Sequence, residues 1–191
     1  EGVKDGRGFV KVAREVSKCK PIILLKGAST AEGARAAASH TASIAVRDDV
    51  FEVACRSAGV LRARSFEEMM DLAKIFAYQP PPRGRGLGVV TFTGAGGVMA
   101  SDRASTEGLE LPELSPGTIR RLQAQMPSWA RAGNPVDAEP LFETLGPDAS
   151  LGFSLDTISK DGHVDMVALF IVALPQFQFD LTRTIAEIRE K

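Results

Sequence analysis

Three consecutive prolines at positions 80–82, followed by two glycines, interrupt the chain near its middle. Proline lacks the backbone donor that a helix or a central strand requires, and glycine leaves the backbone flexible. The segment therefore ends any regular element that reaches it. We predict a linker at residues 80–86, which separates one domain at residues 1–79 from a second domain at residues 87–191.

Apolar residues in the first predicted domain follow two patterns. Some recur every three or four positions, as on one face of a helix, and others form short unbroken runs, as in a buried strand. The expected helices are residues 7–18, 31–38, 48–58 and 65–76, and the expected strands are residues 22–25 and 60–62. Ser65 and Glu68 have the spacing of a capping box, which supports the start of the last helix.

The second predicted domain shows the same alternation of strands and helices. The expected strands are residues 87–92, 109–111 and 164–172, the expected helices are residues 98–107, 115–124, 151–160 and 181–189, and a loop is expected at residues 127–148. Strands that alternate with helices favour an α/β fold with parallel sheets.

The composition is that of an ordinary globular protein, with 44% hydrophobic and 25% charged residues. A formal net charge of -1 indicates neither a nucleic-acid partner nor a membrane partner. No apolar run approaches the roughly 20 residues that span a bilayer. Cys19 and Cys55 are too few for a disulfide framework, so we expect two thiols in a reducing cytoplasm.

A glycine-rich turn follows the first strand of the second domain and precedes a helix. It consists of Thr93, Gly94, Ala95, Gly96 and Gly97. Glycines let backbone amides approach an anion closely, and the amino end of a helix adds partial positive charge. The turn lacks the lysine of a P-loop, and Met99 stands where a dinucleotide fold has its third glycine. A phosphate-binding turn and a tight turn without a ligand both remain open on this pattern.

The chain has two histidines, His40 and His163. His163 follows Asp161 and Gly162 and is predicted to be a surface turn residue. His40 follows the alanine-rich helix among small residues, which leave room for a bulky group to approach the imidazole. No second histidine or thiolate lies at metal-ligand spacing, so no metal site is predicted. A nucleophile or base and an exposed capping residue are both consistent with this position.

Four segments together resemble the ADP-forming acetyl-CoA synthetases, a family related to succinyl-CoA synthetase. They are residues 20–27 (KPIILLKG), 33–41 (GARAAASHT), 89–102 (VVTFTGAGGVMASD) and 133–137 (GNPVD). The resemblance covers nearly the whole chain in the family's order, and residues 78–80 fall where the family has a domain joint. It implies two flavodoxin-like parallel-sheet domains, the first of them truncated at its amino end.

The resemblance also implies roles for individual residues. His40 matches the histidine that carries a phosphoryl group, and Glu1 matches a glutamate that orients and polarises this histidine. The turn at residues 93–97 resembles the helix terminus that cradles the phosphoryl group. Lys4, Lys26 and Arg35 are interpreted as solvated surface groups.

The family interconverts acyl-CoA, phosphate and ADP with acid, CoA and ATP through an acyl phosphate and a phosphohistidine. By resemblance, this protein is an acid-thiol ligase whose complete form uses CoA, ADP or ATP and Mg²⁺ as substrates, without a tightly bound cofactor. The family's CoA-binding and ATP-grasp domains are missing from this chain, which is expected to be inactive alone. We expect a cytoplasmic oligomer that works through contacts between domains or subunits.

Two other interpretations remain. Ala42 and Val46 stand where the family has or often has glycine. These departures favour a regulatory or binding module that has lost turnover, as in relatives fused to acetyltransferase domains. A flavin-binding protein of flavodoxin-like fold would give a yellow preparation, but the low aromatic content of 6% gives it little support.

Overall fold

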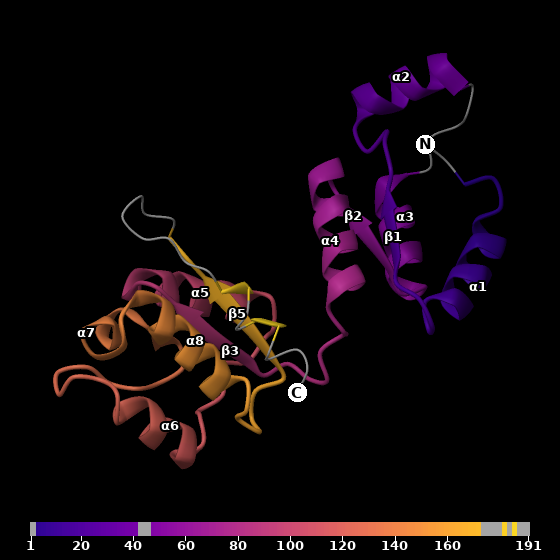
Figure 1. Cartoon of the computed structure of the whole chain (residues 1–191). Helices are drawn as coiled ribbons and strands as arrows, with labels where there is room; N and C mark the ends of the chain where they lie inside the picture. Colours follow the sequence, from indigo (N-terminus) through magenta and orange to yellow (C-terminus); the bar gives the residue numbers. More distant parts are fainter. Residues whose placement is uncertain (1–2, 42–46, 173–180, 183–184, 187–191) are drawn as a thin grey trace. The chain divides into compact units, whose positions relative to one another are not determined.

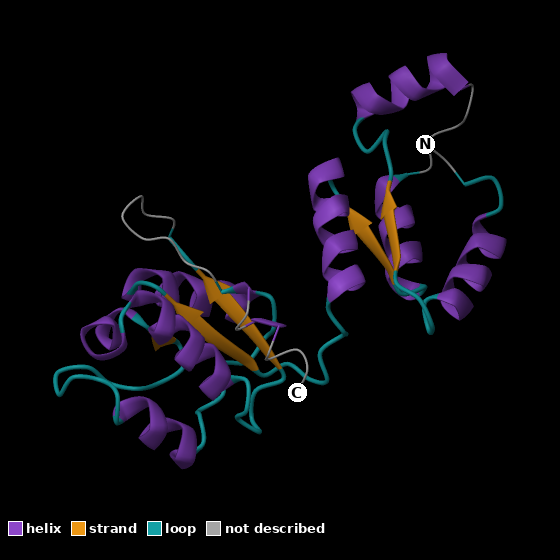
Figure 2. Ribbon diagram, viewed as in Figure 1, coloured by secondary structure: helices purple, strands orange, loops and turns teal. Residues whose placement is uncertain are grey.

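A computed structural model describes residues 3–41, 47–172, 181–182 and 185–186. The chain divides within the proline run into two compact units, Glu1–Pro81 and Pro82–Lys191. Each unit has its own parallel sheet and its own core (Figures 1 and 2). In the described part of the chain, every helix is too short or too polar to cross a membrane.

The first unit is built around a two-stranded parallel sheet. Its elements in chain order are α1 (Gly6–Val16), β1 (Ile22–Leu25), α2 (Ala31–Thr41), α3 (Asp48–Ser57), β2 (Val60–Ala63) and α4 (Phe66–Tyr78). The strands pair in parallel, with Ile22 opposite Val60 and Leu25 opposite Ala63. All six predicted elements are present, with their ends moved by up to three residues. The capping box is also confirmed, because the Ser65 hydroxyl accepts a hydrogen bond from the Glu68 amide at 3.1 Å.

The core of the first unit lies where α1 and α3 meet the sheet, and Figure 1 shows α4 on the opposite side of the sheet from α1. Phe51 and Cys55 of α3 are buried there against Val60 of β2. Burial raises the pKa of the Cys55 thiol, which makes it a poor nucleophile. Cys19 is exposed, and both thiols are free.

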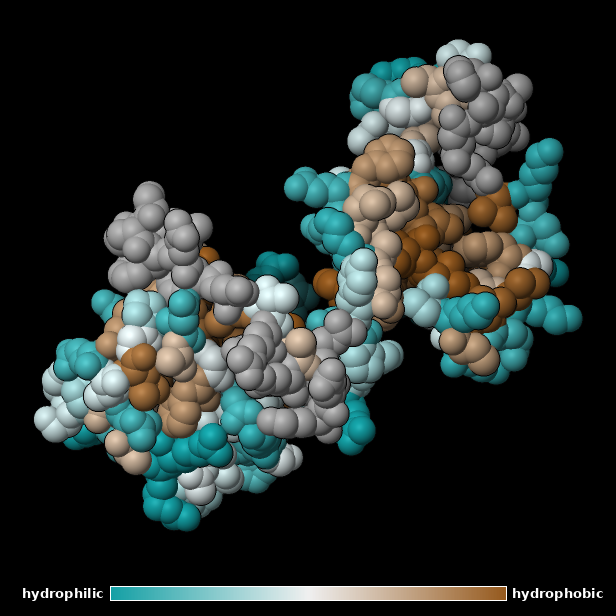
Figure 3. Space-filling model, in the orientation of Figure 1, coloured by the Kyte–Doolittle hydropathy of each residue, from teal (hydrophilic) through white to brown (hydrophobic). Residues whose placement is uncertain are grey.

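One edge of this sheet is apolar and incompletely covered. Among the described residues β1 pairs with β2 alone, and all four residues of β1 are only half-buried. Figure 3 shows hydrophobic residues gathered at the surface of the first unit, between α4 and α1. Such an edge presents unpaired backbone groups beside apolar side chains, an arrangement that proteins usually cover.

The second unit has a three-stranded parallel sheet in the order β4-β3-β5. Its strands are β3 (Leu87–Thr91), β4 (Val136–Asp137) and β5 (Met166–Phe170). The helix α5 (Gly94–Thr106) leads from β3 towards β4, and α8 (Pro147–Ile158) leads from β4 to β5. The chain thus leaves β3 to one side and returns on the other, so the carboxyl end of β3 is a topological switch point. All of β3 is buried, as expected for a central parallel strand.

The predicted loop at residues 127–148 is wrong from Val136 onwards. This part contains β4, the 3₁₀ helix η1 (Glu139–Leu141), α7 (Phe142–Leu145) and the first turn of α8. Pro140 and Pro147 lie in the first turn of their helices, where the missing donor is tolerated, so they do not break the structure. Val136 and Leu141 are fully buried, and this burial stabilises elements too short to show a periodic pattern.

Other predictions for this unit differ in detail. The predicted strand at residues 109–111 is a single bridge from Glu110 to Gly86. The helix α6 (Pro116–Gln123) agrees with the prediction, and its Ser115 cap accepts a hydrogen bond from the Thr118 amide. The helix predicted at residues 181–189 falls largely outside the described residues.

The Asn134 side chain extends the sheet where β4 is too short to reach. Its Oδ1 accepts a hydrogen bond from the Val89 amide at 2.9 Å, and its Nδ2 donates to the Leu87 carbonyl at 2.9 Å. The same Nδ2 donates to the Pro112 carbonyl at 3.1 Å. One side-chain amide therefore satisfies backbone groups of the buried central strand that no neighbouring strand reaches.

A buried carboxylate ties the start of α6 to the turn before β5. The side chain of Asp161 is fully buried, and it accepts hydrogen bonds from the amides of Ser115 at 2.7 Å and of His163 at 3.0 Å. Burial alone would raise the pKa of Asp161. Hydrogen bonds from the Thr118 hydroxyl, the two amides and the Ser115 hydroxyl outweigh it and lower the pKa to about 2.

This network predicts a stability change in acid. Because the pKa of Asp161 is lower in the folded state, its stabilisation is complete above the unfolded value near 4 and is lost as the pH falls towards 2. The loss should amount to about 2 kcal/mol of unfolding free energy. Denaturant unfolding between pH 6 and pH 2 measures it. Asp161→Asn should be less stable at pH 6 and should lack this part of the pH dependence; an unchanged profile would contradict the assignment.

Candidate phosphate-binding site

The helix α5 begins earlier than the sequence predicted. Residues 93–97 were expected to form a turn before a helix at residues 98–107, but α5 starts at Gly94. Thr93 is the cap: its backbone is extended, with φ -147° and ψ 146°, and its hydroxyl accepts a hydrogen bond from the Gly96 amide at 3.2 Å. Capping by threonine offsets the poor helix propensity of the glycines, so Gly94 to Gly97 form the first turn of the helix.

The exit of β3 is held by a second threonine. The buried Thr91 hydroxyl donates a hydrogen bond to the Thr93 carbonyl and accepts one from the Thr93 amide at 3.0 Å. The two threonines together set the direction in which the chain leaves the sheet and enters α5. The amino end of α5 is thereby fixed at the switch point of the sheet.

A cavity of about 170 Å³ opens beside this helix terminus. Its lining comes from the ends of β3 and β4 and from the first two turns of α5, and consists of Thr91, Gly94, Gly97, Val98, Ser101, Pro135 and Asp137. A Cβ atom added to Gly94 would lie 3.3 Å from Oδ2 of Asp137, and one added to Gly97 would lie 3.1 Å from Cβ of Pro135. Because Gly94 and Gly97 have no side chain, the first turn of α5 can lie close to β4 and leave the cavity between them open.

The amides of this terminus are suited to an anion. The first amides of an α-helix have no intrahelical acceptor, so those of Gly94 and Ala95 are available, and both residues are exposed. Thirteen residues of aligned peptide dipoles add partial positive charge at the same point. The cavity is several times the roughly 30 Å³ that one water molecule occupies, which is room for a phosphoryl group.

Asp137 is a site residue to which the sequence analysis assigned no role. It is the last residue of β4, and its Oδ1 accepts a hydrogen bond from the Glu139 amide at 3.1 Å. The carboxylate lines the cavity together with the first residues of α5. Its position within the GNPVD segment, directly after a short apolar pair, is the signal that indicates a residue at the carboxyl edge of a sheet.

The two predicted catalytic residues belong to the first unit. His40 is the next-to-last residue of α2, so its backbone is helical, and the description of α2 side chains stops at Ser39. Glu1, Ala42 and Val46 lie outside the described residues. The structure therefore gathers the predicted phosphate-binding residues of the second unit around one helix terminus, and the roles of His40 and Glu1 stay predictions.

The interpretation of Lys26 as a solvated surface group is wrong. Lys26 is only 7% exposed, and its ammonium lies 3.3 Å from Oδ1 of Asp48. A pairing partner 22 residues away is not visible in a local pattern, which explains the error. Lys4 and Arg35 are exposed, as predicted. His163 is exposed too, with its Nδ1 2.9 Å from the Glu113 carbonyl oxygen.

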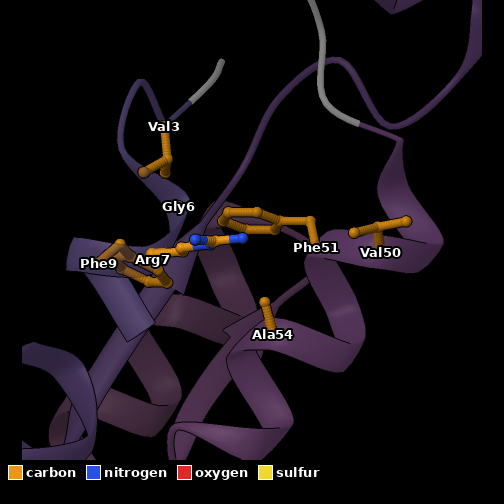
Figure 4. A pocket seen from close by; sticks show the side chains of 7 residues that line it. All are labelled: Val3, Gly6, Arg7, Phe9, Val50, Phe51 and Ala54. Atoms are coloured by element: carbon orange, nitrogen blue, oxygen red, sulfur yellow. The ribbon is translucent and has the colours of Figure 1, made fainter. Parts of the chain in front are cut away.

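A second hollow of about 330 Å³ lies between the start of α1 and α3 (Figure 4). Its lining is almost entirely apolar and consists of Val3, Gly6, Arg7, Phe9, Val50, Phe51 and Ala54. The Arg7 guanidinium is its single charged group, and it contains neither a carboxylate nor a nucleophile. The chemistry predicted for this chain therefore points to the cavity beside α5.

Comparisons with known proteins show the family to which the chain belongs. Residues 1–76 match the family described as succinyl-CoA ligase like flavodoxin domain. Acetate–CoA ligase (ADP-forming) II of Archaeoglobus fulgidus is 39% identical over 167 residues, which are 87% of this chain and 24% of that protein. The alpha subunit of acetate–CoA ligase (ADP-forming) II of Pyrococcus furiosus is 42% identical over 177 residues, 93% of this chain and 37% of the subunit. The chain belongs to the ADP-forming acyl-CoA synthetase family.

A solved synthetase of this family has the same fold. It is the dinucleotide forming acetyl-coenzyme A synthetase 1 of Ca. Korarchaeum cryptofilum, in complex with phosphate and ADP. It matches with a TM-score of 0.86 and 31% identity over 100% of this chain and 41% of that chain. The predicted α/β class with parallel sheets is confirmed. The chain spans less than half the length of each of these three synthetases.

Proposed function

We propose that this chain is part of an acyl-CoA synthetase that interconverts acyl-CoA, phosphate and ADP with acid, CoA and ATP through a phosphohistidine at His40. The observation that carries the proposal is the amino end of α5, with its free amides beside a cavity at the switch point of the sheet. Ligands of open parallel sheets bind at such points. We infer the reaction from the family, and we infer from the helix terminus where the phosphoryl group binds.

The proposed chemistry has three steps. Phosphate first attacks the thioester carbon of acyl-CoA, the carbon–sulfur bond breaks, and acyl phosphate and CoA are formed. One ring nitrogen of neutral His40 attacks the phosphorus of an acyl phosphate, the bond from phosphorus to the acyl oxygen breaks, and the carboxylate leaves. A terminal phosphate oxygen of ADP then attacks the same phosphorus, and the bond from nitrogen to phosphorus breaks. Glu1 accepts a hydrogen bond from the other ring nitrogen, which sets the tautomer and stabilises the positive ring.

The amides of Gly94 and Ala95 are assigned to the transferring phosphoryl group. Its charge is spread over three oxygens, and oriented backbone donors stabilise that charge without having to reorganise. The exposed position of both residues supports this role. The carboxylate of Asp137 lines the same cavity, and the oriented amides of the helix terminus have to outweigh its repulsion of the phosphoryl oxygens.

The remaining machinery is assigned to chain beyond these 191 residues. We propose that CoA-binding and ATP-grasp domains bind CoA and the Mg²⁺ nucleotide. The Pyrococcus furiosus relative is named as an alpha subunit, which supports a protein that works together with another polypeptide. The 191 residues alone are therefore expected to be inactive.

The test is phosphoryl labelling of the complete protein. Radiolabelled ATP with Mg²⁺, or acetyl-CoA with labelled phosphate, should give an acid-labile and alkali-stable label in the wild type. His40→Asn should carry none, because the nucleophile is missing, whereas the matched control His163→Asn should label normally. Label that persists in His40→Asn would disprove the assignment, and an unlabelled wild type would favour the inactive regulatory module.

A further inference from the structure

The helix that carries His40 is held mainly at its ends. The segment at residues 27–47 follows β1, contains α2 and precedes α3, and its residues 42–46 lie outside the described part of the chain. Of the α2 side chains that the structure describes, Ala37 alone is buried, and Figure 1 shows α2 standing away from β1 and β2. The position of α2 therefore depends on how the two ends of the segment are fixed.

An ion pair with a buried lysine joins these two ends. Lys26 directly precedes the segment and Asp48 directly follows it, and Nζ of Lys26 lies 3.3 Å from Oδ1 of Asp48. The Lys26 side chain is only 3% exposed and the Asp48 side chain is 36% exposed, so water reaches the pair only from the carboxylate side. The pair therefore holds together the two ends of the segment that carries His40.

Arg62 links the Lys26–Asp48 pair to the sheet. This residue of β2 binds the Asp48 carboxylate with both terminal nitrogens, at 2.9 and 3.2 Å, and the Glu52 carboxylate at 2.9 Å. The Arg62 guanidinium beside Asp48 lowers the pKa of that carboxyl, so Asp48 is charged at neutral pH. The Phe51 ring lies 5.6 Å from the Lys26 ammonium and 5.4 Å from the Arg62 guanidinium, close enough for cation–π attraction.

The same lysine holds the strained turn from which α2 starts. Ala28 has a φ of 61°, a left-handed conformation that costs free energy for any residue with a side chain. Nζ of Lys26 donates to the carbonyls of Gly27 at 3.3 Å and of Ala28 at 3.4 Å. The ammonium that binds Asp48 therefore also holds this turn. One group fixes the distance between the two ends of the segment and the direction in which the chain enters α2.

Stability alone does not explain this arrangement. Burying a lysine costs free energy that a carboxylate partner seldom more than repays, and an apolar side chain usually stabilises such a site equally well. What an ion pair adds is a defined geometry, because the charges must meet at fixed distances. We propose that Lys26, Asp48 and Arg62 are positioning residues that hold the segment at residues 27–47 in the orientation in which His40 exchanges its phosphoryl group. The inference rests on the proposed function of His40.

Lys26→Met in the complete protein tests the inference. Methionine fills much of the same volume and leaves the Asp48–Arg62 pair intact, so the protein should fold. The rate of label transfer to His40, from ATP and from acetyl-CoA with phosphate, should fall by about tenfold to a hundredfold because the nucleophile is misplaced. The KM for ATP should not change. If Lys26→Met does not fold, Lys26→Gln takes its place with the same expectation.

Asp49→Asn is the matched control. It removes the ion pair between Asp49 and Arg47, which lies one residue from Asp48 but is exposed and reaches neither strand. This variant should transfer label at the wild-type rate. Amide hydrogen exchange adds a direct readout: residues 31–39 should exchange faster in Lys26→Met than in the wild type, whereas α1 should not change.

The outcomes separate the two proposals. A folded Lys26→Met protein with wild-type transfer rates overturns the positioning role and leaves the assignment of His40 intact. A lower melting temperature with unchanged rates also overturns it, since the lysine then serves stability alone. Label that persists in His40→Asn overturns the proposed function itself.

Discussion

Replacing Asn134, the single asparagine of the chain, with aspartate should lower the unfolding free energy of the second unit by about 3 to 5 kcal/mol. One carboxylate oxygen can still accept the hydrogen bond from the Val89 amide. The other oxygen would face the carbonyls of Leu87 and Pro112, which lie 2.9 and 3.1 Å from the present donor. Two hydrogen bonds become two repulsive contacts beside a buried strand, and the carbonyls lose their donor.

Urea denaturation monitored by far-UV circular dichroism and by Trp129 fluorescence measures this effect. Trp129 is the only tryptophan and belongs to the second unit, so its signal reports on that unit. Asn134→Ala should be intermediate, because it removes the bonds without adding a charge. Gln79→Glu makes the same amide-to-acid change at an exposed position and should have little effect. Equal stability of Asn134→Asp and Gln79→Glu would contradict the role of the amide in the sheet.

Gly86→Ala, which adds one methyl group, should have the second largest effect. We expect it to lower the unfolding free energy of the second unit by about 2 to 3 kcal/mol. An added Cβ would lie 2.4 Å from the His163 carbonyl oxygen and 3.0 Å from Oδ2 of Asp165. The first of these atoms belongs to the backbone and cannot rotate away. The Gly86 amide also donates to Asp165 at 2.8 Å, and its carbonyl accepts from the Asp165 amide at 2.8 Å. The methyl group would therefore force apart the segments that begin β3 and β5.

The same denaturation experiment applied to Gly86→Ala needs a glycine control in the same region. Gly162 serves, because a Cβ there would meet no atom within 4 Å. Gly162→Ala should be neutral or slightly stabilising, since alanine reduces the entropy of the unfolded chain. If the two variants unfold at the same urea concentration, the close approach of the two strands is not a constraint on stability.

Local signals in the sequence were reliable for the class of fold and for helix starts. The caps at Ser65 and Ser115 are where the pattern placed them, since a cap depends on a hydrogen bond only three residues long. Apolar runs likewise located β1 and β3, because an unbroken apolar run is typical of a parallel strand; β3 is fully buried and β1 is half-buried. The start of α5 at Gly94 was misplaced because three glycines in its first four residues weaken the helical signal, which the Thr93 cap offsets in the structure.

Long-range contacts decided the rest. The strand β4 has two residues and exists because β3 lies beside it, and Asp137 becomes a site residue because β4 ends at the amino terminus of α5. Lys26 is an ordinary lysine in the sequence and a buried ion-pair partner in the fold, because Asp48 and Arg62 approach it from distant positions. The sequence by itself determined the alternation of strands and helices, the glycine-rich segment between β3 and the following helix, and the resemblance around His40. Tertiary structure alone decided which charges are buried and which groups share a cavity, because both depend on residues that meet only after the chain has folded.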